Sequence, residues 1–271
     1  MNLTFPVPVQ MQVVVFLAAL IRFGGIFLTA PFYSGLSVPV QVKIGLVFFL
    51  TACVAPLMGD QGPVVLARTA SPLTLAILVL GELSVGFTIG MAGAVVVGAI
   101  QTAGNLVAQD IGLTIANVID PITSIQTTVV GQMMVALALF IFVGLDFHHG
   151  VIRLLTESFR ILPLGTAGDA LLGSGERLGR VALVQGSWLF DVSVRLSLPV
   201  SVGLLLVTIA MGFLARAVPE MNVFIIGFGL RIFVGMWVII LSLPFLATAF
   251  QSLFEKAARE SAVALRALAG S

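Results

Sequence analysis

Long apolar runs, separated by short polar or Pro/Gly-containing connections, dominate this chain of 271 residues. A membrane-spanning helix needs about 20 consecutive apolar residues, and about six runs approach or exceed that length. Unpaired backbone amides are not tolerated in hydrocarbon, and the short alternating segments of a membrane barrel are missing. We therefore predict an all-α polytopic membrane protein, built from about six long hydrophobic helices arranged as hairpins, with Pro199 kinking the fifth. The runs cover residues 10–28, 40–58, 72–100, 126–146, 181–215 and 223–250.

The connections between these runs differ in character. Residues 101–125 are semi-polar and lack Lys and Arg. Residues 147–180 carry several arginines, which predicts an amphipathic helix followed by a Gly-rich link. Residues 255–271 predict a short charged helix. No soluble segment separates from the rest, so we expect residues 1–271 to form a single membrane domain.

Composition agrees with a membrane protein and excludes several classes. Hydrophobic residues make up 59% of the chain and charged residues only 9%, whereas soluble domains carry roughly 25% charged residues. A net charge of +1 without a basic run excludes nucleic acid as a partner. Cys53 is the only cysteine, so no internal disulfide forms, and we interpret it as a small buried hydrophobic residue.

The distribution of Lys and Arg over the connections predicts the orientation in the membrane, because cytoplasmic loops carry the excess of positive charge. One side holds only Lys43 and Arg216. Both termini are therefore expected on the other side, the cytoplasm, which holds Arg68, Arg153, Arg160, Arg177, Arg180, Lys256, Arg259 and Arg266.

Four charged residues, Arg22, Glu82, Arg195 and Arg231, lie inside or at the edges of apolar runs. Each costs roughly 2.5–3.5 kcal/mol at the centre of a membrane on insertion scales. Such residues face protein or a water-filled cavity. Two interpretations stay open: an ion or solute pathway, or structural ion pairs between helices.

Small residues recur every fourth position after Glu82, namely Gly86, Gly90, Ala94 and Gly98. This spacing places them along one helix face, where small residues allow two helix backbones to approach closely. The close neighbour is either another helix of this chain or a partner subunit, and spacing alone does not decide between them.

One short segment, Asp146-Phe147-His148-His149, contains residue types that bind metals. Adjacent histidines are expected to point to different sides of a helix, and no third ligand stands at a matching spacing, so we predict no metal site here. The sequence also lacks a Walker-type loop, a GxSxG nucleophile motif and an HExxH motif. We therefore predict no enzymatic activity and no cofactor.

Several motifs follow one another along the chain. They are Arg22-x-x-Gly25 before Pro31 and Pro39; Glu82-x3-Gly86-x3-Gly90; Gln101-x-Ala103-Gly104; Gln109-Asp110-Ile111-Gly112; Asp120-Pro121; His149 before Ser158-Phe159 and Pro163; and Arg216-x-x-Pro219-x-Met221-Asn222-Val223-Phe224 before Gly227. In this order and spacing the chain resembles the FliR family, also called SctT, of the type III secretion export gate. The last motif favours the flagellar branch over the injectisome branch. Glu220 departs from the family, which often has Gln there.

The resemblance implies a non-catalytic subunit of a protein-export channel in the bacterial inner membrane, within the flagellar basal body. The implied partners are FliP-like, FliQ-like, FlhB-like and FlhA-like proteins, membrane lipid and unfolded export substrates. The residues implied in helix packing and assembly are Arg22, Glu82, Gly86, Gly90, Arg216, Pro219, Met221, Asn222 and Phe224.

The resemblance also implies that a loop at residues 106–123 projects into the channel and plugs it at rest. Apolar residues in this connection could seal a narrow passage to water and ions. The residues implied in the plug are Gln109, Asp110, Ile111, Gly112, Leu113, Ile115, Asp120 and Pro121. The alternative function is a stand-alone secondary transporter or ion channel that uses Arg22, Glu82 and Arg231 as pathway residues.

Overall fold

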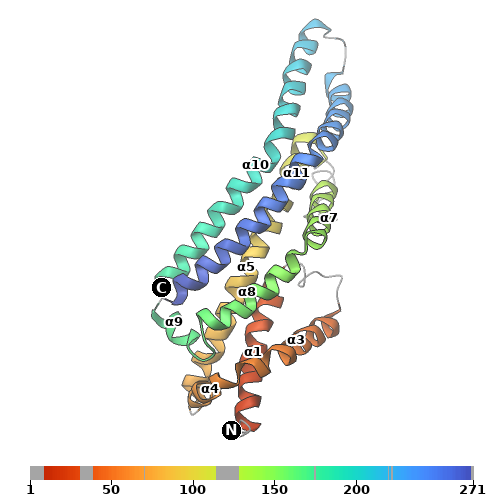
Figure 1. Cartoon of the computed structure of the whole chain (residues 1–271). Helices are drawn as coiled ribbons and strands as arrows, with labels where there is room; N and C mark the ends of the chain where they lie inside the picture. Colours follow the sequence, from red (N-terminus) through yellow and green to blue (C-terminus); the bar gives the residue numbers. More distant parts are fainter. Residues whose placement is uncertain are drawn as a thin grey trace. The chain divides into compact units, whose positions relative to one another are not determined.

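The computed structural model describes residues 9–30, 39–69, 71–113, 128–173, 175–218, 220 and 222–269. Within these ranges every regular element is a helix and none is a strand, so the predicted all-α class is confirmed. In chain order (Figure 1) the helices are α1 (Val9–Thr29), α3 (Val40–Val54), the 3₁₀ helix η1 (Ala55–Gln61), α4 (Gly62–Arg68), α5 (Pro72–Ile111), α7 (Val129–Gly144), α8 (Phe147–Ile161), α9 (Ala167–Gly173), α10 (Gly175–Ala217) and α11 (Val223–Ala269).

Fewer helices are long enough to cross a membrane than the sequence suggested. Among the described residues α1, α5, α10 and α11 qualify by length and composition, and the bent pair α7 and α8 raises the number from 4 to 5. The predicted run 40–58 is not one long helix, because α3 has 15 residues and ends at Val54. Pro56 in η1 lacks the backbone N–H that would continue the α-helical ladder.

The two last helices are longer than predicted. Helix α10 has 43 residues and continues through Pro199 as one helix, and α11 has 47 residues and continues through Pro244. The charged residues 255–269 are thus the end of α11, which corrects the prediction of a separate short helix. This stretch is rich in Ala, Leu, Glu and Arg, which favour helix formation, so α11 continues beyond the end of the apolar run.

The chain divides into two compact units, each assembled from separate segments of sequence. The first comprises Met1–Val95, Asp146–Gln185 and Glu255–Ser271. Its core joins apolar side chains from α1, α5, α8 and the end of α11: Val15, Ala19, Phe23, Ile26, Val85, Ile89, Leu155, Phe159 and Leu265. Cys53 of α3 is exposed, which corrects its interpretation as a buried residue.

The second unit comprises Val96–Leu145 and Gly186–Phe254. Here the corresponding parts of α10 and α11 lie side by side (Figure 1), and a Cβ added at Gly203 of α10 would lie 3.3 Å from Val238 of α11. Phe142 of α7 packs edge-on against Phe254 of α11, with ring centroids 5.2 Å apart. The single membrane domain over residues 1–271 stays a prediction.

Candidate functional site

The most deeply buried charges of the described chain form one ion pair. Arg22 of α1 and Glu82 of α5 are both 0% exposed, and the Arg22 Nε atom lies 2.6 Å from the Glu82 Oε2 atom. Such a pair is tolerated in an apolar interior only with good geometry and further hydrogen bonds. The structure therefore favours a structural ion pair over a pathway for these two residues.

Further hydrogen bonds support this polar cluster, although the buried Arg22 Nη2 atom has no hydrogen-bond partner among the described residues. The second carboxylate oxygen of Glu82 accepts from the Gly165 N–H at 2.9 Å. The Arg22 Nη1 group donates to the Ser158 hydroxyl at 3.3 Å, and the guanidinium carbon lies 4.5 Å from the Phe159 ring centroid. Gly165 has φ 84°, a left-handed conformation that favours glycine. The cluster thus joins α1, α5, α8 and the turn after α8. Sequence reasoning missed Ser158 and Gly165 as its members.

The Gly residues beside Glu82 bring α1 and α5 into backbone contact. A Cβ added at Gly86 would clash with the Arg22 carbonyl oxygen and lie 3.0 Å from the Gly25 Cα. A Cβ at Gly90 would clash with the Thr29 hydroxyl and lie 2.9 Å from the Ile26 carbonyl oxygen. Internal packing, one of the two interpretations left open by the sequence, therefore describes Gly86 and Gly90.

The later part of the same helix face is less crowded. A Cβ added at Gly98 would lie 3.5 Å from Leu189, an ordinary van der Waals contact, and Ala94 is partly exposed. The backbone contact between helices is thus confined to the first half of the predicted stripe.

The other two charged residues in apolar helices lie in the second unit and have partners of their own. Arg195 donates to Asp191, one turn earlier on α10, at 2.9 Å, and both side chains are exposed. Arg231 of α11 donates to the Thr208 hydroxyl of α10 at 3.2 Å. Neither residue takes part in the buried cluster around Arg22.

Helix α5 continues to Ile111 and ends inside the predicted plug loop, so residues 106–111 are helical, which corrects the prediction that the whole of 106–123 is a loop. Gly112 has φ 94°, and its N–H donates to the Gln109 carbonyl oxygen at 2.9 Å. The Leu113 N–H donates to the Ala108 carbonyl oxygen at 3.0 Å. Together these bonds form a Schellman motif, which ends helices at a left-handed glycine. Gly112 therefore has a structural role in ending α5.

Neighbouring residues of α5 are held within the second unit. Ile111 is 0% exposed, and a Cβ added at Gly235 of α11 would lie 2.6 Å from its Cγ1 atom. Asp110 accepts a hydrogen bond from the Ser201 hydroxyl of α10, while Gln109 is exposed. Of the predicted plug residues described, Ile111 and Gly112 are thus buried in the fold, and Leu113 is 37% exposed.

Hydrogen bonds between Asn105 of α5 and Thr128, the residue before α7, hold the start of α7 against α5, and the sequence did not predict them. The side-chain Oδ1 atom of Asn105 accepts from the Thr128 hydroxyl at 2.8 Å and from the Thr128 N–H at 3.3 Å. A Cβ added at Gly104 would lie 2.5 Å from the Gly131 Cα. Residues 105 and 128 therefore hold the two ends of the intervening segment together. The plug residues Ile115, Asp120 and Pro121 lie outside the described residues.

The motif between α10 and α11 is described only in part. Arg216 is exposed near the end of α10. At the start of α11, the side-chain Oδ1 atom of Asn222 accepts a hydrogen bond from the Ile225 N–H at 3.4 Å. Phe224 lies in the first turn of α11. The positions of Pro219 and Met221 lie outside the described residues.

The two histidines lie closer together than the sequence suggested. The ring centroids of His148 and His149 are 4.2 Å apart, and both rings lie near the carboxylate of Asp146. We expected the two adjacent histidines to point to different sides of the helix and no third metal ligand to lie near them. Both expectations are wrong, because the two rings lie together and Asp146 lies beside them. Asp146 adopts φ 56°, which positions its side chain beside both rings.

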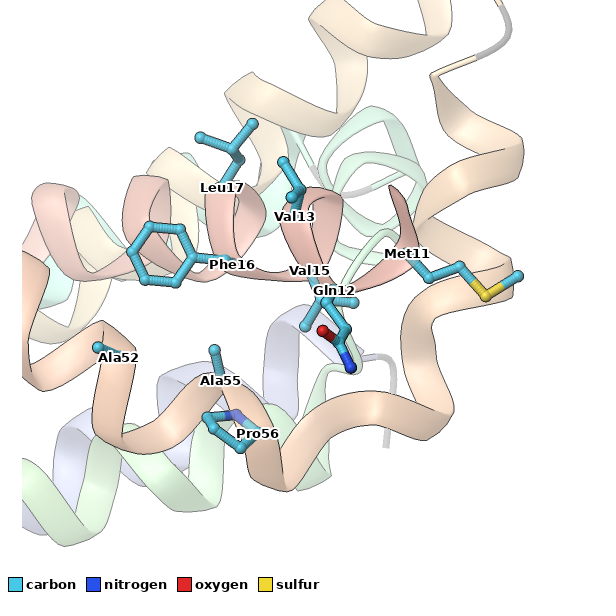
Figure 2. A pocket seen from close by; sticks show the side chains of 9 residues that line it. All are labelled: Met11, Gln12, Val13, Val15, Phe16, Leu17, Ala52, Ala55 and Pro56. Carbon is cyan, nitrogen blue, oxygen red and sulfur yellow. The ribbon is translucent and has the colours of Figure 1, made fainter. Parts of the chain in front are cut away.

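An apolar pocket of about 480 Å³ lies between α1 and the segment formed by α3 and η1. In Figure 2, Gln12 points toward Pro56, while Val13 and Leu17 project from the other side of α1. The lining lacks an ionisable side chain, which suits apolar contact better than catalysis. It consists of Met11, Gln12, Val13, Val15, Phe16, Leu17, Ala52, Ala55 and Pro56.

Comparisons with known proteins identify the family. Residues 13–257 match the family model described as bacterial export proteins, family 1. The flagellar biosynthetic protein FliR of Escherichia coli (strain K12) is 32% identical over 241 residues, which cover 88% of this chain and 87% of that protein.

Two further relatives cover similar shares. FliR of Bacillus subtilis (strain 168) is 29% identical over 244 residues, 88% of this chain and 90% of that protein. FliR of Caulobacter vibrioides is 26% identical over 239 residues, 86% of this chain and 90% of that protein. Since the family model spans most of the sequence, this chain belongs to the bacterial export proteins, family 1.

Proposed function

We propose that this chain is a non-catalytic subunit of the flagellar protein-export channel in the bacterial inner membrane. Its similarity to proteins named flagellar biosynthetic protein FliR, over most of both chains, supports a role in the flagellar export apparatus. The sequence offers neither a nucleotide-binding motif nor a group of intramembrane acids that could relay protons. The energy for export therefore comes from other components.

The observation that carries this proposal is the exposed apolar surface of α10 and α11. In the most apolar part of each of these helices only 17% of the residues are buried, compared with 61% in α5. Lipid alone or partner subunits must cover this surface, because water cannot. Exposed large side chains include Leu198, Leu205, Leu206, Phe213, Phe233, Trp237, Ile240 and Leu241.

We assign this surface to partner subunits of the FliP-like and FliQ-like kinds, with lipid on the remainder. FlhB-like and FlhA-like proteins and unfolded export substrates complete the proposed partners. The exposed basic residues Lys256 and Arg259, in the part of α11 that follows the apolar run, support a cytoplasmic C-terminus.

The plug function is proposed for the stretch that follows the helix stop at Gly112. Ile111 and Gly112 are buried in the described structure, which supports a role for them as the fixed base of the plug and not as its moving part. The apolar residues Leu113, Ile115 and Ile119 then form the seal against water and ions. The contact between Asn105 and Thr128 keeps both ends of this stretch at one place on α5.

The transporter or ion-channel alternative gains no support from the geometry. The charges of Arg22 and Glu82 neutralise each other and both side chains are 0% exposed, so neither side chain is accessible to a transported ion or solute.

Secretion in the source bacterium tests the proposal. Cells that lack this chain should stop releasing flagellar proteins into the medium, and the wild-type chain should restore release. Leu206→Asp places a charge on the apolar surface of α10, where Leu206 is 63% exposed, and should fail to restore release. Leu206→Met, which keeps the same position apolar, is the matched control and should restore it. Normal release without the chain, or with Leu206→Asp, would contradict the proposal.

A further inference from the structure

The segment between α7 and α8 contains an Asp in an unusual conformation. Asp146 has φ 56° and is the only non-glycine residue with positive φ among the described positions. It occupies the N-cap of α8, where an Asp side chain normally accepts a hydrogen bond from the first turn of the helix. Here the side chain makes no capping bond. Its carboxylate lies beside two imidazoles instead.

The distances in this cluster are longer than direct hydrogen bonds. The Asp146 Oδ1 atom lies 3.5 Å from the His149 Nδ1 atom and 3.8 Å from the His148 Nε2 atom, whereas N–H···O bonds span about 2.7–3.2 Å. Donor atoms of all three residues lie within 4.8 Å of one another. Ligands of a tetrahedral Zn²⁺ ion, with bonds of about 2.0–2.2 Å, are separated by about 3.4 Å.

The ring of His148 is not held in place by a hydrogen bond at its other nitrogen. Its Nδ1 atom is buried and has no hydrogen-bond partner within the described residues, so no hydrogen bond at that atom orients the ring. A bond to a cation at the Nε2 atom would fix both the ring and its tautomer. The side chains of His148, His149 and Asp146 are 33%, 60% and 73% exposed, so a cation reaches the cluster from solvent.

We propose that Asp146, His148 and His149 form a binding site for a divalent transition-metal cation, of which Zn²⁺ fits best. Two imidazoles and one carboxylate are ligands typical of Zn²⁺, and water completes the tetrahedral geometry. The partial positive charge at the start of α8 opposes a cation, so binding depends strongly on the negative charge of Asp146. A bound ion would tie the first turn of α8 to the residue that precedes it.

Metal titration of the purified full chain tests the proposal. The chain is prepared in detergent with an affinity tag free of histidine, and Zn²⁺ affinity is measured by competition with a coloured chelator. The sequence has 2 histidines, both in this cluster, and 1 cysteine, so Cys53 is the sole competing imidazole or thiolate ligand in it. Substituting Co²⁺ for Zn²⁺ adds a spectroscopic readout, because four-coordinate Co²⁺ absorbs intensely in the visible range.

We expect one equivalent of Zn²⁺ to bind, with affinity reduced about tenfold or more by Asp146→Asn and by His149→Asn. Asparagine tolerates the left-handed backbone at position 146, so the first variant retains the fold. Cys53→Ser and Glu157→Gln are matched controls and should bind like wild type. The proposal is overturned if wild type binds no Zn²⁺, if Asp146→Asn binds as tightly as wild type, or if Cys53→Ser removes binding.

Discussion

The buried pair of Arg22 and Glu82 allows a sharp test of what these charges do. Glu82→Gln keeps the size of the side chain and an oxygen that can accept from the Gly165 N–H, but it leaves the Arg22 guanidinium without a counter-charge at 0% exposure. Removing one member of a buried ion pair costs about 3–5 kcal/mol, because the remaining charge stays in an apolar interior. We expect a loss of this size in the free energy of unfolding.

The double variant Arg22→Met/Glu82→Gln separates a structural role from proton transfer. It leaves no buried charge at the pair and still satisfies the Gly165 N–H, so we expect it to recover most of the stability lost in Glu82→Gln. Each single variant leaves one uncompensated buried charge and the double variant leaves none, so the coupling energy of this pair should exceed the roughly 0.5–3 kcal/mol found for most contacting residues. If Glu82 carried protons, the double variant would stay inactive in export even when it is stable.

The wild type, Glu82→Gln, Arg22→Met and the double variant form a double-mutant cycle. The unfolding of each is followed by circular dichroism in mixed micelles of a mild detergent and dodecyl sulfate. Export is measured in parallel as flagellar protein released into the medium. Equal stability of Glu82→Gln and wild type would refute the reasoning. A double variant that is as unstable as the sum of both single changes would refute it as well.

Three further results are expected. Gly25→Ala places a Cβ 2.8 Å from the Leu83 carbonyl oxygen and should lower stability by about 1–3 kcal/mol, whereas Gly24→Ala meets no atom within 4 Å and should be neutral in the same unfolding assay. Gly112→Ala forces a side chain into φ 94° and should lower stability by about 1–2 kcal/mol, and unchanged unfolding would remove its role as a helix stop. Deleting residues 114–117 while keeping Gly112 should leave an assembled channel that leaks small ions, measured by dye entry into cells; a tight channel would argue against the plug.

The helix class followed from the sequence, but helix lengths did not. Hydropathy reports how much of a segment suits lipid, and it says little about where a helix ends. The apolar segment 40–58 is broken at η1 because of Pro56, and α11 continues past its apolar part into charged residues that also favour helix. The helix ends therefore depend on local features, such as a proline or a run of helix-favouring residues, and not on hydropathy.

The two charged residues of the candidate site were predictable from the sequence, but their contacts were not. Intramembrane charge singled out Arg22 and Glu82, yet they are 60 positions apart and nothing in one sequence pairs them. Ser158 belongs to one of the family motifs, but the motif does not reveal its contact with Arg22, and Gly165 carries no distinctive signal because glycine is common in turns. For His148 and His149 the helical angle between neighbours suggested separation, but side-chain torsions and the left-handed Asp146 bring the three groups together.

Mild detergent extraction from the source bacterium, with an affinity tag on this chain, tests the central claim most directly. The mass and composition of the purified particle are measured by native mass spectrometry. We expect one stable particle that contains this chain together with FliP-like and FliQ-like proteins, since we assign the exposed apolar surface of α10 and α11 to partner subunits. A stable, well-behaved monomer that transports a small solute on its own would contradict the assignment to a protein-export channel.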